Sequence, residues 1–192
     1  MQADFAVELG QDDDALEIPW ASAEGGPRYY DLKRQPELLV QIEDASRVPA
    51  LSDFLAVVNA PSSLLETAKC DAWCSTEINP EEEIFEASHK FGSYVDLLFS
   101  DLAARSSFSA HEEFVKRLSE LLQRMPEFPA AAEFMIRRCY YRCEGQEQEG
   151  FYITFYLFGY GDDEAQSRKH WREGLKLVAN AIRGCTFPLT ES

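Results

Sequence analysis

The chain has 192 residues, and its 34 acidic and 18 basic residues give a formal net charge of -16. A field of this sign repels phosphate backbones and anionic membranes, which disfavours nucleic-acid and membrane-surface binding as general functions. The sequence contains no apolar run long enough for a transmembrane helix, and its first residues do not resemble a signal peptide. We therefore expect a cytoplasmic protein built on one main domain.

Three segments differ in how regular their patterns are. Residues 1–35 show little periodicity, and we expect a loosely organised N-terminal segment that contains short strands. Residues 36–186 are periodic throughout and are expected to form a single α+β domain. Residues 187–192 are expected to be a short tail.

Hydrophobic periodicity predicts the elements of the domain. Apolar residues at the spacing i, i+3, i+4, i+7 predict three helices, and alternation of apolar residues predicts the strands between them. In chain order we expect a helix at 49–59, strands at 67–78, 84–89 and 91–100, a helix at 109–124, strands at 133–143 and 151–160, and a helix at 163–183.

The predicted order of elements indicates a fold class. Strands linked by hairpins pair antiparallel, so we expect an α+β fold in which an antiparallel sheet of four or five strands carries helices on one face. The order α-β-β-(β)-α-β-β-α and the acidity over residues 49–183 resemble the type III secretion chaperone-like fold. This resemblance implies a chaperone-like fold, and it assigns a role to no individual residue.

No constellation typical of catalysis is present. The histidines are scattered, and neither a phosphate-binding glycine loop nor a nucleophile elbow occurs. Two aspartates follow Gly159 and Gly161 at the start of the last helix, where they would repel a phosphate. We expect no catalytic residue and no cofactor.

Two Cys-x3-Cys pairs suggest zinc at first sight. On a strand, however, residues four apart are separated by about 13 Å, which is too far for one metal. A site assembled from both pairs across strands is the alternative to small buried hydrophobic side chains. We expect no metal, and the odd number of cysteines favours reduced thiols. The cysteines are Cys70, Cys74, Cys139, Cys143 and Cys185.

The strand at 151–160 is the most informative part of the chain. It carries large apolar or aromatic side chains on both faces, which is typical of a central strand with both sides covered. One face is a natural core face. The other face is rich in tyrosine, and the function of the protein depends on what covers this face.

The hairpin register identifies the candidate site. We expect Tyr141 opposite Tyr152 and Arg137 opposite Tyr156, although a slip of one residue would exchange the faces. This register gathers one arginine and three tyrosines, which are residue types enriched at binding hot spots. The candidate binding residues are Arg137, Tyr141, Tyr152 and Tyr156.

Three interpretations of the tyrosine face stay open: cover by the N-terminal segment, an interface with a partner or a second copy, or a small-ligand pocket. The leading hypothesis is an acidic interaction or chaperone-like module without catalytic activity, which binds a basic protein or forms a homodimer. The alternative is a small-molecule-binding protein or an enzyme. In that case Arg137 would hold an anionic group, with Asp96 or Asp71 as acid-base residue.

Overall fold

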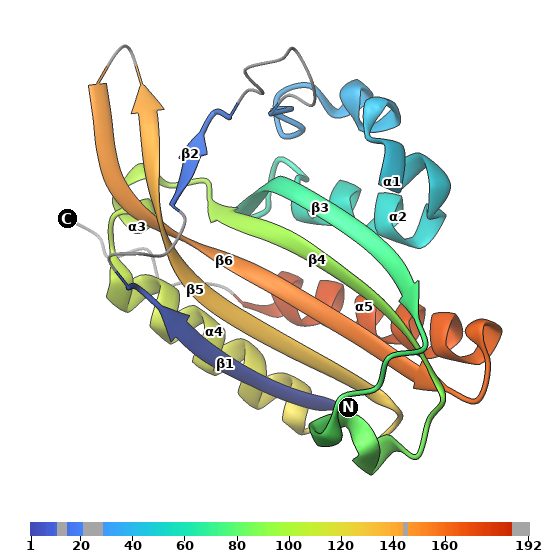
Figure 1. Cartoon of the computed structure of the whole chain (residues 1–192). Helices are drawn as coiled ribbons and strands as arrows, with labels where there is room; N and C mark the ends of the chain where they lie inside the picture. Colours follow the sequence, from blue (N-terminus) through green and yellow to red (C-terminus); the bar gives the residue numbers. More distant parts are fainter. Residues whose placement is uncertain (11–14, 21–28, 144–145, 186–192) are drawn as a thin grey trace.

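The computed structural model describes residues 1–10, 15–20, 29–143 and 146–185 (Figure 1). The expected tail at 187–192 lies outside these residues. The strands are β1 (Gln2–Glu8), β2 (Leu16–Ile18), β3 (Leu65–Ser75), β4 (His89–Phe99), β5 (Ala130–Cys143) and β6 (Gln146–Gly161). The helices are α1 (Glu43–Arg47), α2 (Pro49–Val58), α3 (Leu102–Arg105), α4 (Phe108–Gln123) and α5 (Glu164–Gly184), with 3₁₀ turns η1 (Pro36–Gln41) and η2 (Pro80–Phe85).

The six strands form one mixed sheet in the order β1-β5-β6-β4-β3, and β2 pairs with a further part of β5. The α+β class is therefore confirmed, whereas the purely antiparallel sheet of four or five strands is wrong. Both β1 and β2 run parallel to β5, and the remaining pairs are antiparallel. Parallel pairing across more than 100 residues leaves no hairpin signal in the sequence, which explains the error.

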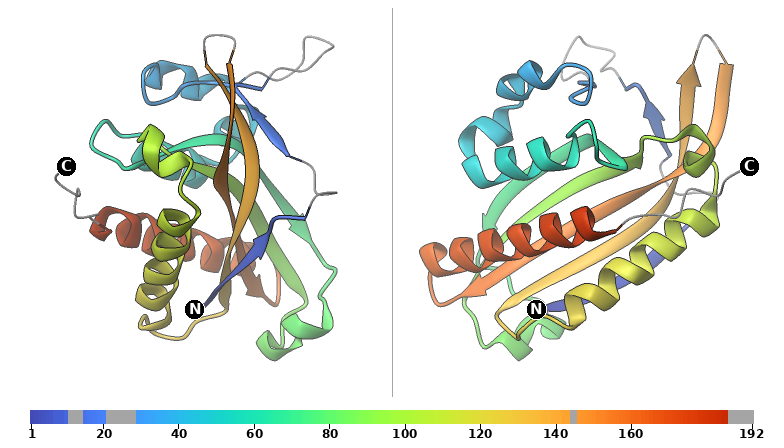
Figure 2. Two further views of the ribbon diagram at one scale, coloured as in Figure 1. Left: turned by 90° about the vertical axis from the view of Figure 1, so that its left-hand side faces the viewer. Right: turned by 180° about the vertical axis from the view of Figure 1, so that it is seen from behind.

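Helices α2, α4 and α5 lie on one face of the sheet (Figure 2). Their apolar residues and the inward residues of the strands form the main core. Phe155 of β6 lies at its centre, with ring centroids 5.1 Å from Phe134 and 5.6 Å from Phe54. Expectation and structure agree for these three helices, because they cover the same side of the sheet.

The helix starts follow from capping side chains. Asp163 accepts a hydrogen bond from the backbone N of Gln166 at 2.8 Å and begins α5, where the sequence predicts the cap. The second long helix begins at Phe108 and is capped by Ser107, two residues before the expected cap at Ser109. The first residue of such a helix depends on which of two nearby serine side chains accepts a hydrogen bond from the unpaired backbone N–H groups of the first turn.

One predicted strand is absent from the described part of the chain. Residues 84–89 were expected as a strand, but η2 occupies Pro80–Phe85 and β4 begins at His89. Glu82 explains the turn, because its carboxylate accepts bonds from the backbone N of Asn79 at 2.7 Å and from Tyr160 Oη at 2.8 Å. These contacts tie η2 to the end of β6 and favour a turn over a strand.

The β5–β6 hairpin has a different register from the expected one. Arg137 pairs with Tyr152 and Glu133 pairs with Tyr156, a shift of four residues along β6. Side chains alternate with a period of two, so an even shift leaves every residue on its expected face. Arg137, Tyr141, Tyr152 and Tyr156 therefore still share one face of the sheet, the face opposite the helices.

Candidate functional site

The tyrosine face is divided into two parts by what lies over it. At the hairpin end, Tyr141 and Tyr152 are only 7% and 5% exposed. They pack in a small second core with residues of the N-terminal segment, whose strand β2 pairs with β5 at this end of the sheet (Figure 1). The covering residues include Leu16, Ile18, Trp20 and Tyr29.

Polar contacts also connect the residues at this covered end. Tyr141 Oη donates to the carbonyl oxygen of Phe151 at 2.7 Å, and the Arg105 guanidinium lies 4.9 Å from the Tyr141 ring centroid. Arg105 also binds the carboxylate of Glu66, which accepts a bond from Tyr29 Oη at 3.1 Å. Of the three interpretations, cover by the N-terminal segment therefore describes the part around Tyr141 and Tyr152.

Beyond the covered end, four half-buried aromatic side chains from three neighbouring strands form what we call the open aromatic face. They are Trp73 of β3, Tyr94 of β4, and Tyr156 and Phe158 of β6. Neighbouring ring centroids lie 6.2 to 6.5 Å apart, so the rings form a continuous array. In Figure 1 this side of the sheet is turned toward the viewer, with the long helices behind it.

Carboxylates flank the two tyrosines of this face in one register row across five strands. The pairings are Asp71 with Tyr94, Tyr94 with Tyr156, Tyr156 with Glu133, and Glu133 with Asp4. Directly opposed side chains lie close enough to act together on one ligand. The row therefore places two aromatic rings between carboxylates, of which Asp71 lies 3.9 Å from Nη2 of Arg47.

A buried carboxyl group lies beside this row. Asp96 is 5% exposed and accepts a hydrogen bond from Thr154 Oγ1 at 2.8 Å. Burial raises its pKa to about 6, although the Thr154 bond and the charges of Lys69 and Arg137 oppose that shift. The carboxyl group thus changes charge close to neutral pH.

Arg137 stands between the two ends, and its charge is already compensated. Its Nη2 lies 2.8 Å from Glu8 Oε2, and its Nη1 donates to Tyr156 Oη at 3.4 Å. The guanidinium carbon lies 6.0 Å from the Tyr156 ring centroid. The structure therefore brings Arg137 together with Tyr152 and Tyr156, while Tyr141 belongs to the polar contacts around Arg105.

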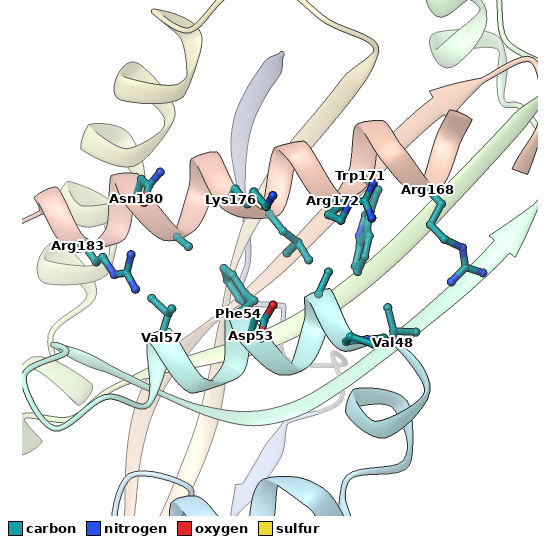
Figure 3. Close-up of a pocket in the computed structure, with 14 residues that line it drawn as sticks. Val48, Asp53, Phe54, Val57, Arg168, Trp171, Arg172, Lys176, Asn180 and Arg183 are labelled. Atoms are coloured by element: carbon teal, nitrogen blue, oxygen red, sulfur yellow. The ribbon is translucent and has the colours of Figure 1, made fainter. Parts of the chain in front are cut away.

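The opposite side of the sheet holds a pocket of about 570 Å³ between α2 and α5 (Figure 3). Its lining residues come from these two helices and from Val48, which precedes α2. The expected small-ligand pocket was placed on the tyrosine face, so this pocket is a separate feature. Among the described residues, no group of three or more His, Cys, Asp or Glu side chains is arranged to hold a metal ion.

Comparison with protein-family models, curated proteins and solved structures finds no match for this chain. In the part of the chain that the structure describes, no helix combines the length and apolar character that a membrane crossing needs.

Of the four residues of the open aromatic face, the sequence identified only Tyr156 as a candidate. It missed Trp73, Tyr94 and Phe158, although alternation places Phe158 on the same face as Tyr156. Strand alternation does place Trp73 on the face of its strand that carries Asp71, and Tyr94 on the face that carries Asp96. What the sequence does not reveal is that β4 lies between β3 and β6, which brings these rings beside Tyr156 and Phe158.

Proposed function

We propose that this protein is a cytoplasmic, non-catalytic interaction module, chaperone-like in the sense that it holds a segment of another protein. The open aromatic face is its binding surface, and a Lys- or Arg-rich segment is the occupant. The observation that carries this proposal is the row in which Tyr94 and Tyr156 lie between Asp71 on one side and Glu133 and Asp4 on the other.

Cation–π attraction and charge favour such an occupant. A cation within about 6 Å of an aromatic ring gains about 0.5 to 2 kcal/mol, and the half-buried rings of this face are partly desolvated already. The flanking carboxylates add attraction at the rim, which mainly increases the rate of association. The net charge of -16 steers a basic partner toward the protein over longer distances.

Charge also disfavours a second copy of the chain as the occupant. In a two-fold symmetric dimer the same patch meets itself. Pairing this face with itself would bring Asp71, Glu133 and Asp4 of one copy close to the same carboxylates of the other. Juxtaposed like charges cost several kcal/mol, so a heterologous basic partner fits better than self-association through this face.

The test uses a fluorescein-labelled peptide of alternating Lys-Ser and Arg-Gly units, with anisotropy measured at about 150 mM salt to screen long-range attraction. The double variant Tyr94→Leu/Tyr156→Leu keeps apolar side chains but removes the ring faces. We expect it to bind about tenfold more weakly than the wild type, because two cation–π contacts are lost.

The control is Tyr140→Leu, which makes the same chemical change on the opposite face of the same sheet. It should bind the peptide as the wild type does. Equal affinity of the double variant and the wild type would refute the proposed surface. Light scattering supplies a second criterion. If the wild type forms a stable dimer and the double variant does not, the occupant of this face is a second copy of the chain and not a basic partner.

A further inference from the structure

The pocket between α2 and α5 is a groove with an apolar floor. Phe54 of α2 and Trp171 and Leu175 of α5 contribute to it, and each is at most 2% exposed. The side chains between the two helices are shown in Figure 3. Since these floor residues already pack in the core, an occupant would rest on the floor without displacing it, and would gain little from hydrophobic burial alone.

The rim of the groove is strongly basic. Arg168, Arg172, Lys176 and Arg183, all from α5, line it, and Asp53 of α2 is the only carboxylate among the lining residues. The helix α5 carries five of the 18 basic residues of the chain and only two acidic ones, Glu164 and Glu173. A local positive field of this kind contrasts with the net charge of -16.

Most of these cations have no partner among the described residues. Arg168 pairs with Glu164 at 2.8 Å and lies over the Phe91 ring, 4.2 Å from its centroid. By contrast, Arg172, Lys176 and Arg183 form no ion pair or hydrogen bond with any residue that the structure describes. Within the part of the chain that the structure describes, nothing therefore competes with a ligand for these three charges.

The spacing of the free cations indicates the shape of that ligand. Arg172 and Lys176 lie one helical turn apart, and Arg183 lies 7 residues further along the same side of α5. At about 1.5 Å per residue, the three cations span about 16 Å along the groove. A single carboxylate or phosphate group is too small to meet all three, whereas acidic residues repeated at i and i+4 on a helix have a matching spacing.

We propose that the groove between α2 and α5 docks an acidic amphipathic helix of a partner protein. The apolar side of that helix rests on Phe54, Trp171 and Leu175, and its carboxylates pair with the free cations of α5. Because the floor contributes little, affinity depends mainly on charge and falls as salt is added. The groove shares no residue with the open aromatic face, so an experiment can refute the proposed binding at one of these sites without affecting the proposal for the other.

The probe is a synthetic, fluorescein-labelled helical peptide of about 16 residues, with Glu on one side and Leu on the other. Anisotropy titrations compare two charge reversals on the same helix. Lys176 lines the groove and Lys169 does not, and both are exposed. We expect Lys176→Glu to weaken binding about five- to tenfold and Lys169→Glu to change it less than about twofold.

Four results would overturn the proposal. The first is the absence of binding at about 1 mM peptide, and the second is an equal loss in both variants, which would indicate general attraction to a cationic helix. The third is equal binding of a scrambled peptide with the same composition. The fourth is thermal stabilisation by decanoate without any binding of the peptide, which would assign the groove to small amphipathic anions.

Discussion

Trp73 and Phe158 meet edge to face across Gly92, with ring centroids 6.2 Å apart. The two rings belong to β3 and β6, which are not neighbours but flank β4 on either side. A Cβ atom at position 92 would lie 2.9 Å from Cε2 of Trp73 and 3.0 Å from Cδ1 of Phe158. The glycine therefore allows aromatic side chains of the two flanking strands to close over the strand between them.

The first prediction concerns this contact. Gly92→Ala should push the two rings apart, lower the free energy of unfolding by about 1 kcal/mol and weaken binding of the basic peptide. Urea unfolding and peptide anisotropy measure the two effects. Gly184→Ala is the matched control, because nothing lies within 4 Å of its added Cβ and alanine favours the helix. If both variants unfold in urea and bind the peptide as the wild type does, Gly92 is not needed for the contact between the two rings.

The second prediction concerns the closer approach of α5 to β6 at Gly159. A Cβ there would lie 2.1 Å from the backbone N of Trp171 and 2.3 Å from the carbonyl oxygen of Ser167. Backbone atoms of a docked helix cannot move aside singly, so Gly159→Ala should cost about 3 kcal/mol or more of unfolding free energy. A shift in the urea midpoint no larger than that of Gly92→Ala would show that α5 does not dock this closely.

The third prediction is a pH dependence caused by Asp96. Its folded-state pKa of about 6 lies above the ordinary value of 3.8, so the folded protein binds more protons between these values. Stability that is fully present below pH 3.8 is then lost as the pH rises through 6. Between about pH 5 and 7.5, the wild type should lose about 1 to 2 kcal/mol relative to Asp96→Asn.

Urea unfolding at these two pH values measures that loss. Thr154→Val removes the hydrogen bond that favours the ionised carboxyl group, so it should raise the pKa of Asp96 further and move the transition to higher pH. If the difference between the wild type and Asp96→Asn stays constant with pH, Asp96 does not titrate in this range.

The fourth prediction concerns the edge of the sheet. β1 covers the edge of the long strand β5, and Gln123 Nε2 of α4 donates to the carbonyl oxygen of Ala3 at 2.8 Å. Removal of residues 1–8 should expose the hydrogen-bonding edge of β5 and cause self-association, which light scattering would detect. Removal of residues 188–192 serves as the control. A truncated protein that stays monomeric would show that β1 is dispensable as an edge cover.

The helical part of the fold was accessible from the sequence because its signals are local. Leu51, Phe54, Leu55 and Val58 predict α2 by their spacing, and all four are buried as expected. The central position of β6 also follows from its two-sided apolar character. These patterns depend on neighbours within a few residues, so they can be recognised in the sequence without knowledge of the topology.

The register and the strand order were less accessible. The arm of β6 from Gln146 to Glu149 is exposed and polar, so it looks like a loop, and the hairpin was predicted too short. The parallel pairing of β1 with β5 and the place of β4 between β3 and β6 depend on contacts distant in sequence. The candidate site was accordingly found in part. Tyr156 belongs to the open aromatic face and Arg137 lies beside it, whereas Trp73 and Tyr94 join that face through the order of the strands.

Because β1 pairs with β5, it is synthesised long before it can join the sheet. Gln2 pairs with Ala131, so the first strand leaves the ribosome 129 residues before its partner. At about 5 to 20 residues per second, it waits roughly 6 to 26 s without a neighbour. Its residues Gln2, Asp4 and Glu8 are polar or charged, and charged edge strands resist pairing with foreign chains. We therefore expect Asp4 and Glu8 to limit pairing of β1 with other chains until β5 has been synthesised.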